Sequence, residues 1–130
     1  MKIIAIDLGL KRIGLAYSAD RNFVTPLAAV ERKNRNQASS AVKAVLEEWG
    51  AEAVVVGIPM GGSSEEEMRR RVAHFMNLVD FDGPVYYQDE SDSSLEAEAL
   101  MKGEMRQKKD GRIDSLSAKI ILERWLAASK

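Results

Sequence analysis

K-I-I-A-I-D-L-G-L-K-R-I-G, residues 2–14, is the stretch that decides the fold of this chain. A short apolar run rich in β-branched residues predicts a strand that is buried on both faces of a sheet. Because an ionised Asp is costly to bury without compensation, the carboxylate in this run, Asp7, needs a partner. Its neighbours in the strand are all apolar: Ile3, Ile4, Ala5, Ile6 and Leu8.

Two interpretations fit Asp7. Gly9 and Gly14 predict a tight turn after the strand, with Lys11 and Arg12 at its tip. Asp7 is then either a ligand for a metal ion or a cap that bonds the backbone of the turn. The glycines favour the ligand, since they let a charged group approach the backbone closely.

Length and composition indicate one domain over residues 1–130, because 130 residues with 45% apolar side chains can bury a core. The absence of cysteine excludes disulfides and thiolate metal sites and fits a reducing compartment. No apolar run reaches membrane-spanning length, and the N-terminus lacks a signal-peptide pattern. We therefore expect a cytoplasmic protein without a membrane partner.

The order of predicted elements indicates an α/β fold. The first three strands are joined by short turns and form an antiparallel meander, and later strands alternate with helices and pair in parallel. This order predicts one five-stranded mixed sheet with helices on both faces. The predicted strands are 3–8, 13–18, 23–30, 53–58 and 85–89, and the predicted helices are 34–49, 63–79, a short one from 93, and 112–128.

Three carboxylates stand out from the solvated majority: Asp7, Glu90 and Asp114. Glu90 ends the last strand, where Asp89 must face the opposite way. Asp114 heads the sheet-facing stripe of the last helix. Each of the two could instead cap a helix, but convergence with Asp7 at one end of the sheet favours a metal site. Oxygen ligands without His or Cys suit Mg²⁺ or Mn²⁺.

The charges are unevenly distributed, although the net charge is −1. Residues 1–50 carry +3, residues 51–101 carry −8 and residues 102–130 carry +4. Residues 102–112 lack periodicity and predict a mobile basic loop. The candidate contacts to nucleic-acid phosphates border the carboxylates: Lys11, Arg12, Lys108, Lys109 and Arg112. In the predicted helix 63–79, we expect a solvated face that carries Arg69–Arg71 and His74.

Four motifs in order resemble the YqgF family of small RNase H-like nucleases, described as Holliday junction resolvases and as processors of the 5′ end of pre-16S ribosomal RNA. They are I-D-L-G-L-K-R-I-G-L-A (6–16), V-V-G-I-P (55–59), Q-D-E-S-D-S-S-L-E-A (88–97) and K-D-G-R-I-D-S-L-S-A-K-I-I-L-E-R (109–124). By this resemblance, Asp7, Glu90 and Asp114 match the catalytic acidic residues of the family. The implied fold is a three-layer α/β/α RNase H-like domain.

The chain departs from the family pattern at two places. The family usually has D-E-R followed by a hydrophobic residue, whereas Ser91 and Asp92 follow Glu90 here. This removes a cation beside the expected metal site and adds an anion, which bears on substrate preference and rate. Related resolvases also carry a fourth carboxylate three residues before the last one, where this chain has Gly111, so Asp110 is at best a weak substitute.

The leading hypothesis is a metal-dependent nuclease in which two ions, about 3.5–4 Å apart, assist hydrolysis of phosphodiester bonds. The resemblance implies pre-16S ribosomal RNA, and hence ribosome-assembly particles, as partners. The alternatives are a Holliday junction resolvase acting on branched DNA and a nucleic-acid-binding assembly protein without turnover. A small surface with no evident apolar stripe favours a monomer acting on single-stranded RNA over a dimer acting on a junction.

Overall fold

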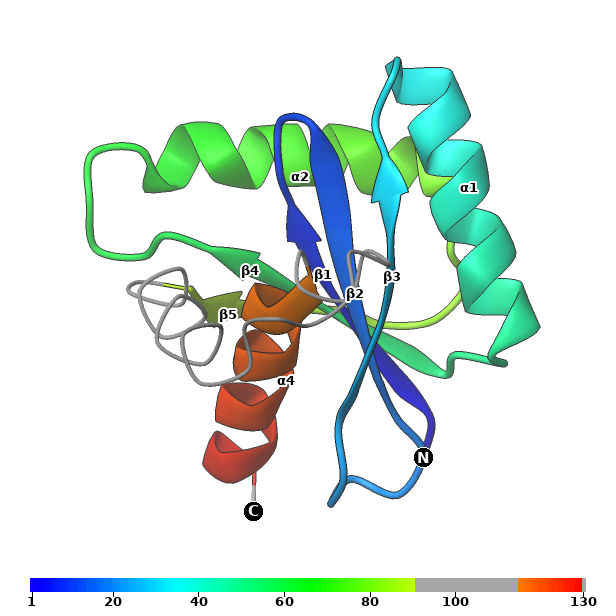
Figure 1. Ribbon diagram of the computed structural model, residues 1–130. Coiled ribbons are helices and arrows are strands. Elements are labelled where there is room, and N and C mark those ends of the chain that lie inside the picture. The colour runs from blue at the N-terminus through cyan, green and yellow to red at the C-terminus, as the bar shows by residue number, and fades with distance from the viewer. Residues whose placement is uncertain (91–114, 130) are drawn as a thin grey trace, which may run out of the picture.

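The computed structural model describes residues 1–90 and 115–129 (Figure 1). A five-stranded sheet with the order β3-β2-β1-β4-β5 is flanked by helices on both faces. The elements are β1 (Ile3–Leu8), β2 (Arg12–Ser18), β3 (Thr25–Glu31), α1 (Arg35–Glu48), β4 (Ala53–Ile58), α2 (Glu65–Val79), β5 (Val85–Asp89) and α4 (Leu116–Ala128).

The strand pairing confirms the expected mixed sheet. β1 pairs with β2, and β2 with β3, in antiparallel orientation, whereas β1 pairs with β4, and β4 with β5, in parallel. β3, which contains Pro26, is an edge strand of the described sheet, as its proline predicts. Since β1, β4 and β5 run in the same direction, their carboxyl ends meet at one edge of the sheet.

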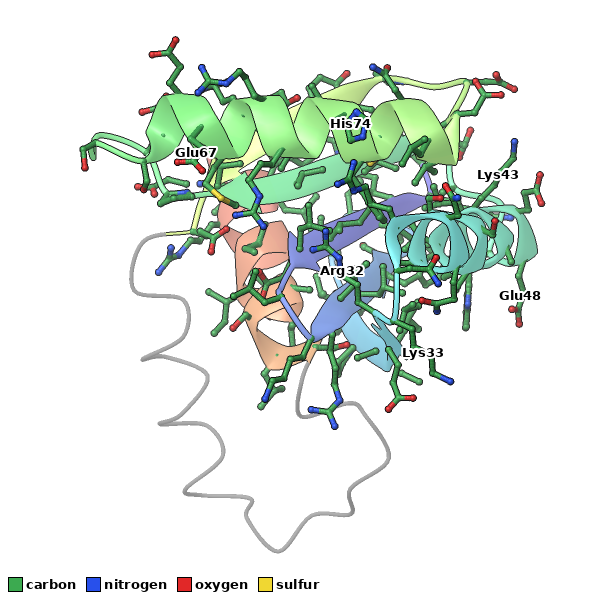
Figure 2. All side chains as sticks on the ribbon, turned by 90° about the horizontal axis from the view of Figure 1, so that it is seen from above. Arg32, Lys33, Lys43, Glu48, Glu67 and His74 are labelled. Carbon is green, nitrogen blue, oxygen red and sulfur yellow. The ribbon has the colours of Figure 1, made fainter. Side chains whose placement is uncertain are left out.

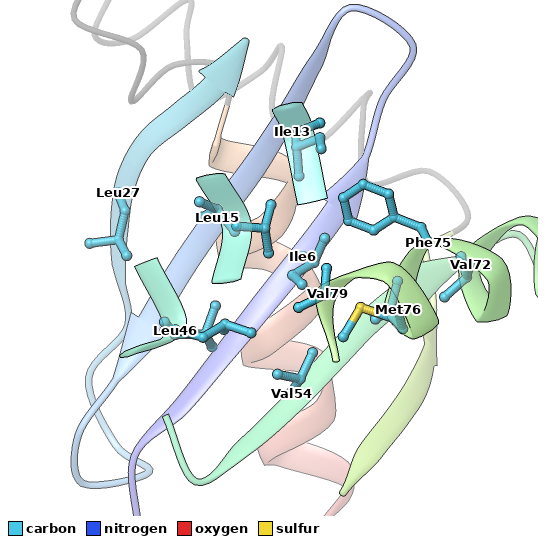
Figure 3. Close-up of a cluster of buried hydrophobic side chains, with 14 of the residues drawn as sticks. Ile6, Ile13, Leu15, Leu27, Leu46, Val54, Val72, Phe75, Met76 and Val79 are labelled. Atoms are coloured by element: carbon cyan, nitrogen blue, oxygen red, sulfur yellow. The ribbon is translucent and has the colours of Figure 1, made fainter. Parts of the chain in front are cut away.

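The core has two halves, one on each face of the sheet. Large apolar side chains of α1 and α2 pack on one face, including Leu46 and Phe75 (Figure 3). Of the described helices, α4 packs on the other face, where Ala118 and Ile121 are fully buried. Successive side chains of a strand point to opposite faces, so each strand residue can be assigned to a face. Ile4 and Ile6 of β1 face α1 and α2, and Ile3 and Ala5 face α4.

The element boundaries follow the predictions closely. Asn34 caps α1 and shares a capping box with Gln37. The third strand was predicted to begin at Phe23, which is wrong, because β3 begins at Thr25 and the Phe23 side chain is 79% exposed. The second strand begins one residue earlier than predicted, at Arg12.

Several predictions lie outside the described residues. They are the short helix from residue 93, the basic loop 102–112, and the first residues of the last helix, which the structure describes from Leu116. Among residues 1–90 and 115–129, no helix has the length and apolar character needed to cross a bilayer.

Candidate active site

Asp7 occupies the carboxyl end of an inner strand. It pairs with Gly14 of β2, and the alternation of β1 directs it to the face covered by α4, while Leu8 packs on the opposite face. Burial raises the pKa of the Asp7 carboxyl above its ordinary value of 3.8. An inner strand therefore holds a carboxylate in a place where its charge is poorly hydrated.

Glu90 lies one residue beyond β5, on the same face of the sheet as Asp7. Its backbone N–H donates to the Ile58 carbonyl at 2.9 Å, which continues the pairing with β4. Burial, followed by the charges of Asp7 and Asp89, raises the pKa of Glu90 to about 7. The structure thus brings Asp7 and Glu90 close enough for their charges to oppose each other.

Asp89 faces away from this pair, as the alternation of strand side chains predicts. Its Oδ1 atom accepts a hydrogen bond from the Met60 N–H at 3.2 Å, on the turn that follows β4. The Asp89 carbonyl accepts a bond from Nη1 of Arg124 on α4 at 3.3 Å. Asp89 therefore ties the end of β5 to its neighbours.

Gly57 separates the two carboxylates across the sheet and was not predicted as a site residue. A Cβ atom at this position of β4 would overlap Cδ1 of Ile121 and would lie 3.2 Å from Cβ of Glu90. Only glycine lets α4 and Glu90 approach β4 so closely. The sequence carries the signal, because a glycine inside a buried strand often marks close approach.

Ser115 anchors the start of α4 beside Asp7. The buried Ser115 Oγ accepts a hydrogen bond from the Leu15 N–H at 3.0 Å, one residue along β2 from Gly14. The sequence alone does not identify this bond. Asp114, the residue before Ser115, lies outside the described residues.

Two of the five candidate phosphate contacts are described. Lys11 is exposed in the β1–β2 turn, and the register of β2 places Arg12 on the same face of the sheet as Asp7. The turn is tight, since a Cβ atom on Gly9 would overlap the Arg12 carbonyl oxygen. The other three candidates, and the departures from the family pattern, lie outside the described residues: Lys108, Lys109, Arg112, Ser91, Asp92, Asp110 and Gly111.

The donor chemistry of this edge fits a divalent cation. Asp7 and Glu90 supply hard carboxylate oxygens, and both would be stabilised in their ionised form by a bound cation, which would offset their burial and mutual repulsion. Within residues 1–90 and 115–129, no three His, Asp or Glu side chains gather as a metal-binding group. The described part of the site is therefore a carboxylate pair.

The fold belongs to the RNase H-like class. The structure resembles RuvC of T. thermophilus in complex with a Holliday junction substrate, with a TM-score of 0.56, 19% identity, and coverage of 99% of this chain and 95% of that one. It also resembles the Holliday junction resolvase of fowlpox virus, with a TM-score of 0.57, 12% identity, and coverage of 98% and 99%.

Sequence comparison then identifies the family. The model of the RuvX family, described as Holliday junction resolvase, matches residues 1–128, and the chain belongs to this family. A protein of Sulfurimonas denitrificans named “Putative pre-16S rRNA nuclease” is 71% identical over 97% of both chains. A relative with the same name in Sulfurovum sp. is 58% identical over 98% of this chain and 99% of its own.

Proposed function

We propose that this protein is a nuclease that uses a divalent metal ion to hydrolyse phosphodiester bonds at the 5′ end of pre-16S ribosomal RNA. The observation that carries the proposal is the half-buried carboxylate pair, Asp7 and Glu90, on one face of the sheet edge. The names of relatives up to 71% identical support the choice of substrate. The proposed active unit is the single domain formed by residues 1–130.

Asp7, Glu90 and Asp114 are the proposed ligands of Mg²⁺ or Mn²⁺. Asp114 is included because Ser115, which follows it in the chain, is fixed to Leu15 beside the strand pair that carries Asp7. If two such ions were held there, they would supply activation of water and stabilisation of the leaving oxygen in phosphodiester cleavage. The chain contributes the orientation of the oxygens, since β1 fixes Asp7 and the end of β5 fixes Glu90.

The proposed phosphate contacts are Lys11, Arg12, Lys108, Lys109 and Arg112. Arg12 has the strongest support, because its place in β2 puts it on the Asp7 face of the sheet. Cations here would hold the backbone of the nucleic acid beside the carboxylates without selecting its sequence. The proposed setting is the cytoplasm, on ribosome-assembly particles that contain the precursor RNA, with the protein acting as a monomer.

Cleavage of branched DNA is the second candidate, because the matching family model is described as Holliday junction resolvase. The deciding experiment compares a pre-16S ribosomal RNA fragment with a four-way DNA junction, each with Mg²⁺, Mn²⁺ or a chelator. We expect metal-dependent cleavage of the RNA by a protein that sediments as a monomer. Symmetric nicking of the junction by a dimer, without action on RNA, would support the resolvase. Binding without cleavage of either substrate would indicate an assembly protein.

A further inference from the structure

A hollow lined by cations lies at the same sheet edge as Asp7, but on the opposite face. It has a volume of about 350 Å³, and β1, the segment after β3, α1 and α2 all contribute to it. Figure 2 looks down on this edge, with His74 on α2 and Arg32 across from it. The lining residues, called the arginine pocket below, are Leu8, Arg32, Arg35, Arg70, Arg71, His74 and Phe75.

The arginine pocket concentrates positive charge in a chain whose net charge is −1. Of its four arginines, Arg70 forms an exposed ion pair with Glu66 at 3.4 Å. Among residues 1–90 and 115–129, no carboxylate lies within ion-pair distance of the other three: Arg32, Arg35 and Arg71. Mutual repulsion between these guanidinium groups would be relieved by an anion in the hollow.

Neutral groups orient two of the arginines. Nη1 of Arg32 donates to the Gly9 carbonyl at 3.0 Å, and the Arg32 N–H donates to the Lys11 carbonyl at 2.8 Å. Nη1 of Arg35 lies 3.0 Å from Nε2 of His74, an arrangement in which the guanidinium donates and the imidazole accepts. These bonds hold the groups in place but leave their charges uncompensated, as in a site for a polyanion.

The pocket is continuous with the carboxylate edge along β1. Leu8 follows Asp7 directly, so the two side chains leave the same strand end toward opposite faces. Arg32 is bonded to Gly9, two residues from Asp7. Consider a nucleic-acid strand whose cleaved phosphate lies at Asp7 and Glu90. It would need to cross only the edge of the sheet to place a neighbouring phosphate in the arginine pocket.

We propose that the arginine pocket is a second phosphate-binding site, which receives the backbone of a single nucleic-acid strand on the side of the sheet opposite the carboxylates. This inference rests on the proposed nuclease function and extends it, since it defines the path of the substrate over the edge. Guanidinium groups suit this role because their planar donors match phosphate oxygens. The spacing of Arg70, Arg71 and His74 along α2 brings these side chains to one helix face.

The test uses the double variant Arg35→Ala/Arg71→Ala, because both side chains are exposed and their loss leaves the core intact. Lys2→Ala/Lys43→Ala is the matched control, since it removes the same formal charge away from the pocket. Affinity for single-stranded RNA is measured at several salt concentrations with Asp7→Asn added to each protein to prevent cleavage. Thermal unfolding verifies that both variants fold.

We expect the Arg35→Ala/Arg71→Ala protein to bind RNA about tenfold more weakly or worse at low salt, with the salt slope reduced by about 1.4 for two lost contacts to a single strand. The control pair should change affinity less than about twofold. Unchanged affinity and slope, or an equal loss in the control pair, would overturn the proposal. A further outcome would also overturn the proposal. If the protein binds pyrophosphate, if Arg35→Ala/Arg71→Ala abolishes this binding, and if RNA does not displace the pyrophosphate, then the pocket holds a free anion.

A second readout separates this inference from the proposed function. Bis(4-nitrophenyl) phosphate is a phosphodiester too small to reach both faces of the sheet. With Asp7 present, the Arg35→Ala/Arg71→Ala protein should hydrolyse it at the unaltered rate while its kcat/KM on RNA falls. If the unaltered protein cleaves neither compound, the nuclease proposal fails, and the RNA-binding comparison still decides the role of the pocket.

Discussion

The two faces of the sheet are packed in different ways. Two helices cover one face with large side chains such as Leu46 and Phe75. Within residues 1–90 and 115–129, one helix, α4, covers the other face, where the packing residues include four alanines: Ala5, Ala16, Ala53 and Ala118. The face with the smaller side chains also carries Asp7, Glu90 and Gly57.

This difference should separate the stability of the fold from the proposed chemistry on the two faces of one sheet. Large apolar side chains remove more area from water, so the α1–α2 face contributes more to the free energy of folding. Small side chains let the backbone of α4 approach the sheet on the face that carries the two carboxylates, and burial there is the largest cause of their raised pKa values. Substitutions on the two faces should therefore have different consequences.

The largest expected effect is on the α4 face. Asp7→Asn should lower the rate of RNA cleavage at least about a thousandfold, equivalent to about 4 kcal/mol of transition-state stabilisation. Its metal-free stability should stay the same or rise, because a buried charge is removed. Asp89→Asn is the control, since Asp89 faces the other way and Asn keeps an oxygen for the Met60 N–H. Equal losses in the two variants, measured by single-turnover cleavage, would contradict the assignment.

Shortening a side chain on the α1–α2 face should lower stability and leave the cleavage rate unchanged. Leu46→Ala leaves a cavity in the larger half of the core and should lower the free energy of unfolding by about 2–4 kcal/mol. Because Leu46 lies away from the carboxylates, the cleavage rate per folded molecule should not change. Urea unfolding followed by tryptophan fluorescence gives the stability, and an activity assay at low temperature gives the rate. A proportional loss of rate in the folded fraction would show that the faces are coupled.

Gly57→Ala tests how closely α4 must approach. The added methyl group overlaps Ile121 and crowds Glu90, so we expect a loss of about 1–3 kcal/mol in stability and a further loss of activity. Ile121→Val, combined with it, removes the Cδ1 atom and should restore part of both. Gly62→Ala is the matched control, because a Cβ atom at Gly62 meets nothing within 4 Å. Equal behaviour of Gly57→Ala and Gly62→Ala in thermal unfolding would contradict this account.

The smallest effect is a pH dependence of the metal-free protein. Glu90 titrates at about 7 when folded and near 4.5 when unfolded, so the folded state holds the extra proton between these values. The free energy of unfolding should therefore fall as pH rises from about 4.5 to 7, and Asp7, also raised, acts in the same direction. We expect about 1–2 kcal/mol after allowance for solvent screening of the partly exposed Glu90.

The control for this pH dependence is Glu90→Gln, which should flatten the stability profile between pH 5 and 8 in chelator-treated protein. Saturating Mg²⁺ should stabilise the unaltered protein most at high pH, where both carboxylates are ionised. If the free energy of unfolding rises with pH between pH 5 and 8, the account is contradicted, because folding then does not disfavour the ionised form of Glu90.

Much of the fold could be predicted because local signals agree with it. The apolar run at 53–58 became β4 with the predicted bounds, and Asn34 caps α1 as its residue type favours. The face assignments of Asp89 and Glu90 followed from strand alternation alone. Phe23 was misplaced because its β propensity is high, whereas the turn before β3 leaves it in solvent.

The parts of the site that were missed depend on contacts between distant segments. The bond from Leu15 to Ser115 joins residues a hundred positions apart, and no local pattern specifies it. The arginine pocket likewise combines α2 with Arg32 and Arg35 from another part of the chain. On its own helix, His74 is an exposed residue, as predicted, and only the tertiary fold places it 3.0 Å from Arg35.

The position of β4 has a consequence for how long the site persists during native-state fluctuations. All six residues of β4 are buried and it lies between β1 and β5, so the amide hydrogens of β1 and β4 should exchange with solvent only on global unfolding. Glu90 instead follows an edge strand of the described sheet, where its N–H donates to Ile58. Local opening there should expose the Glu90 amide to exchange while the Asp7 amide stays protected. Of the two proposed metal ligands, Asp7 would then be held permanently and Glu90 could be released.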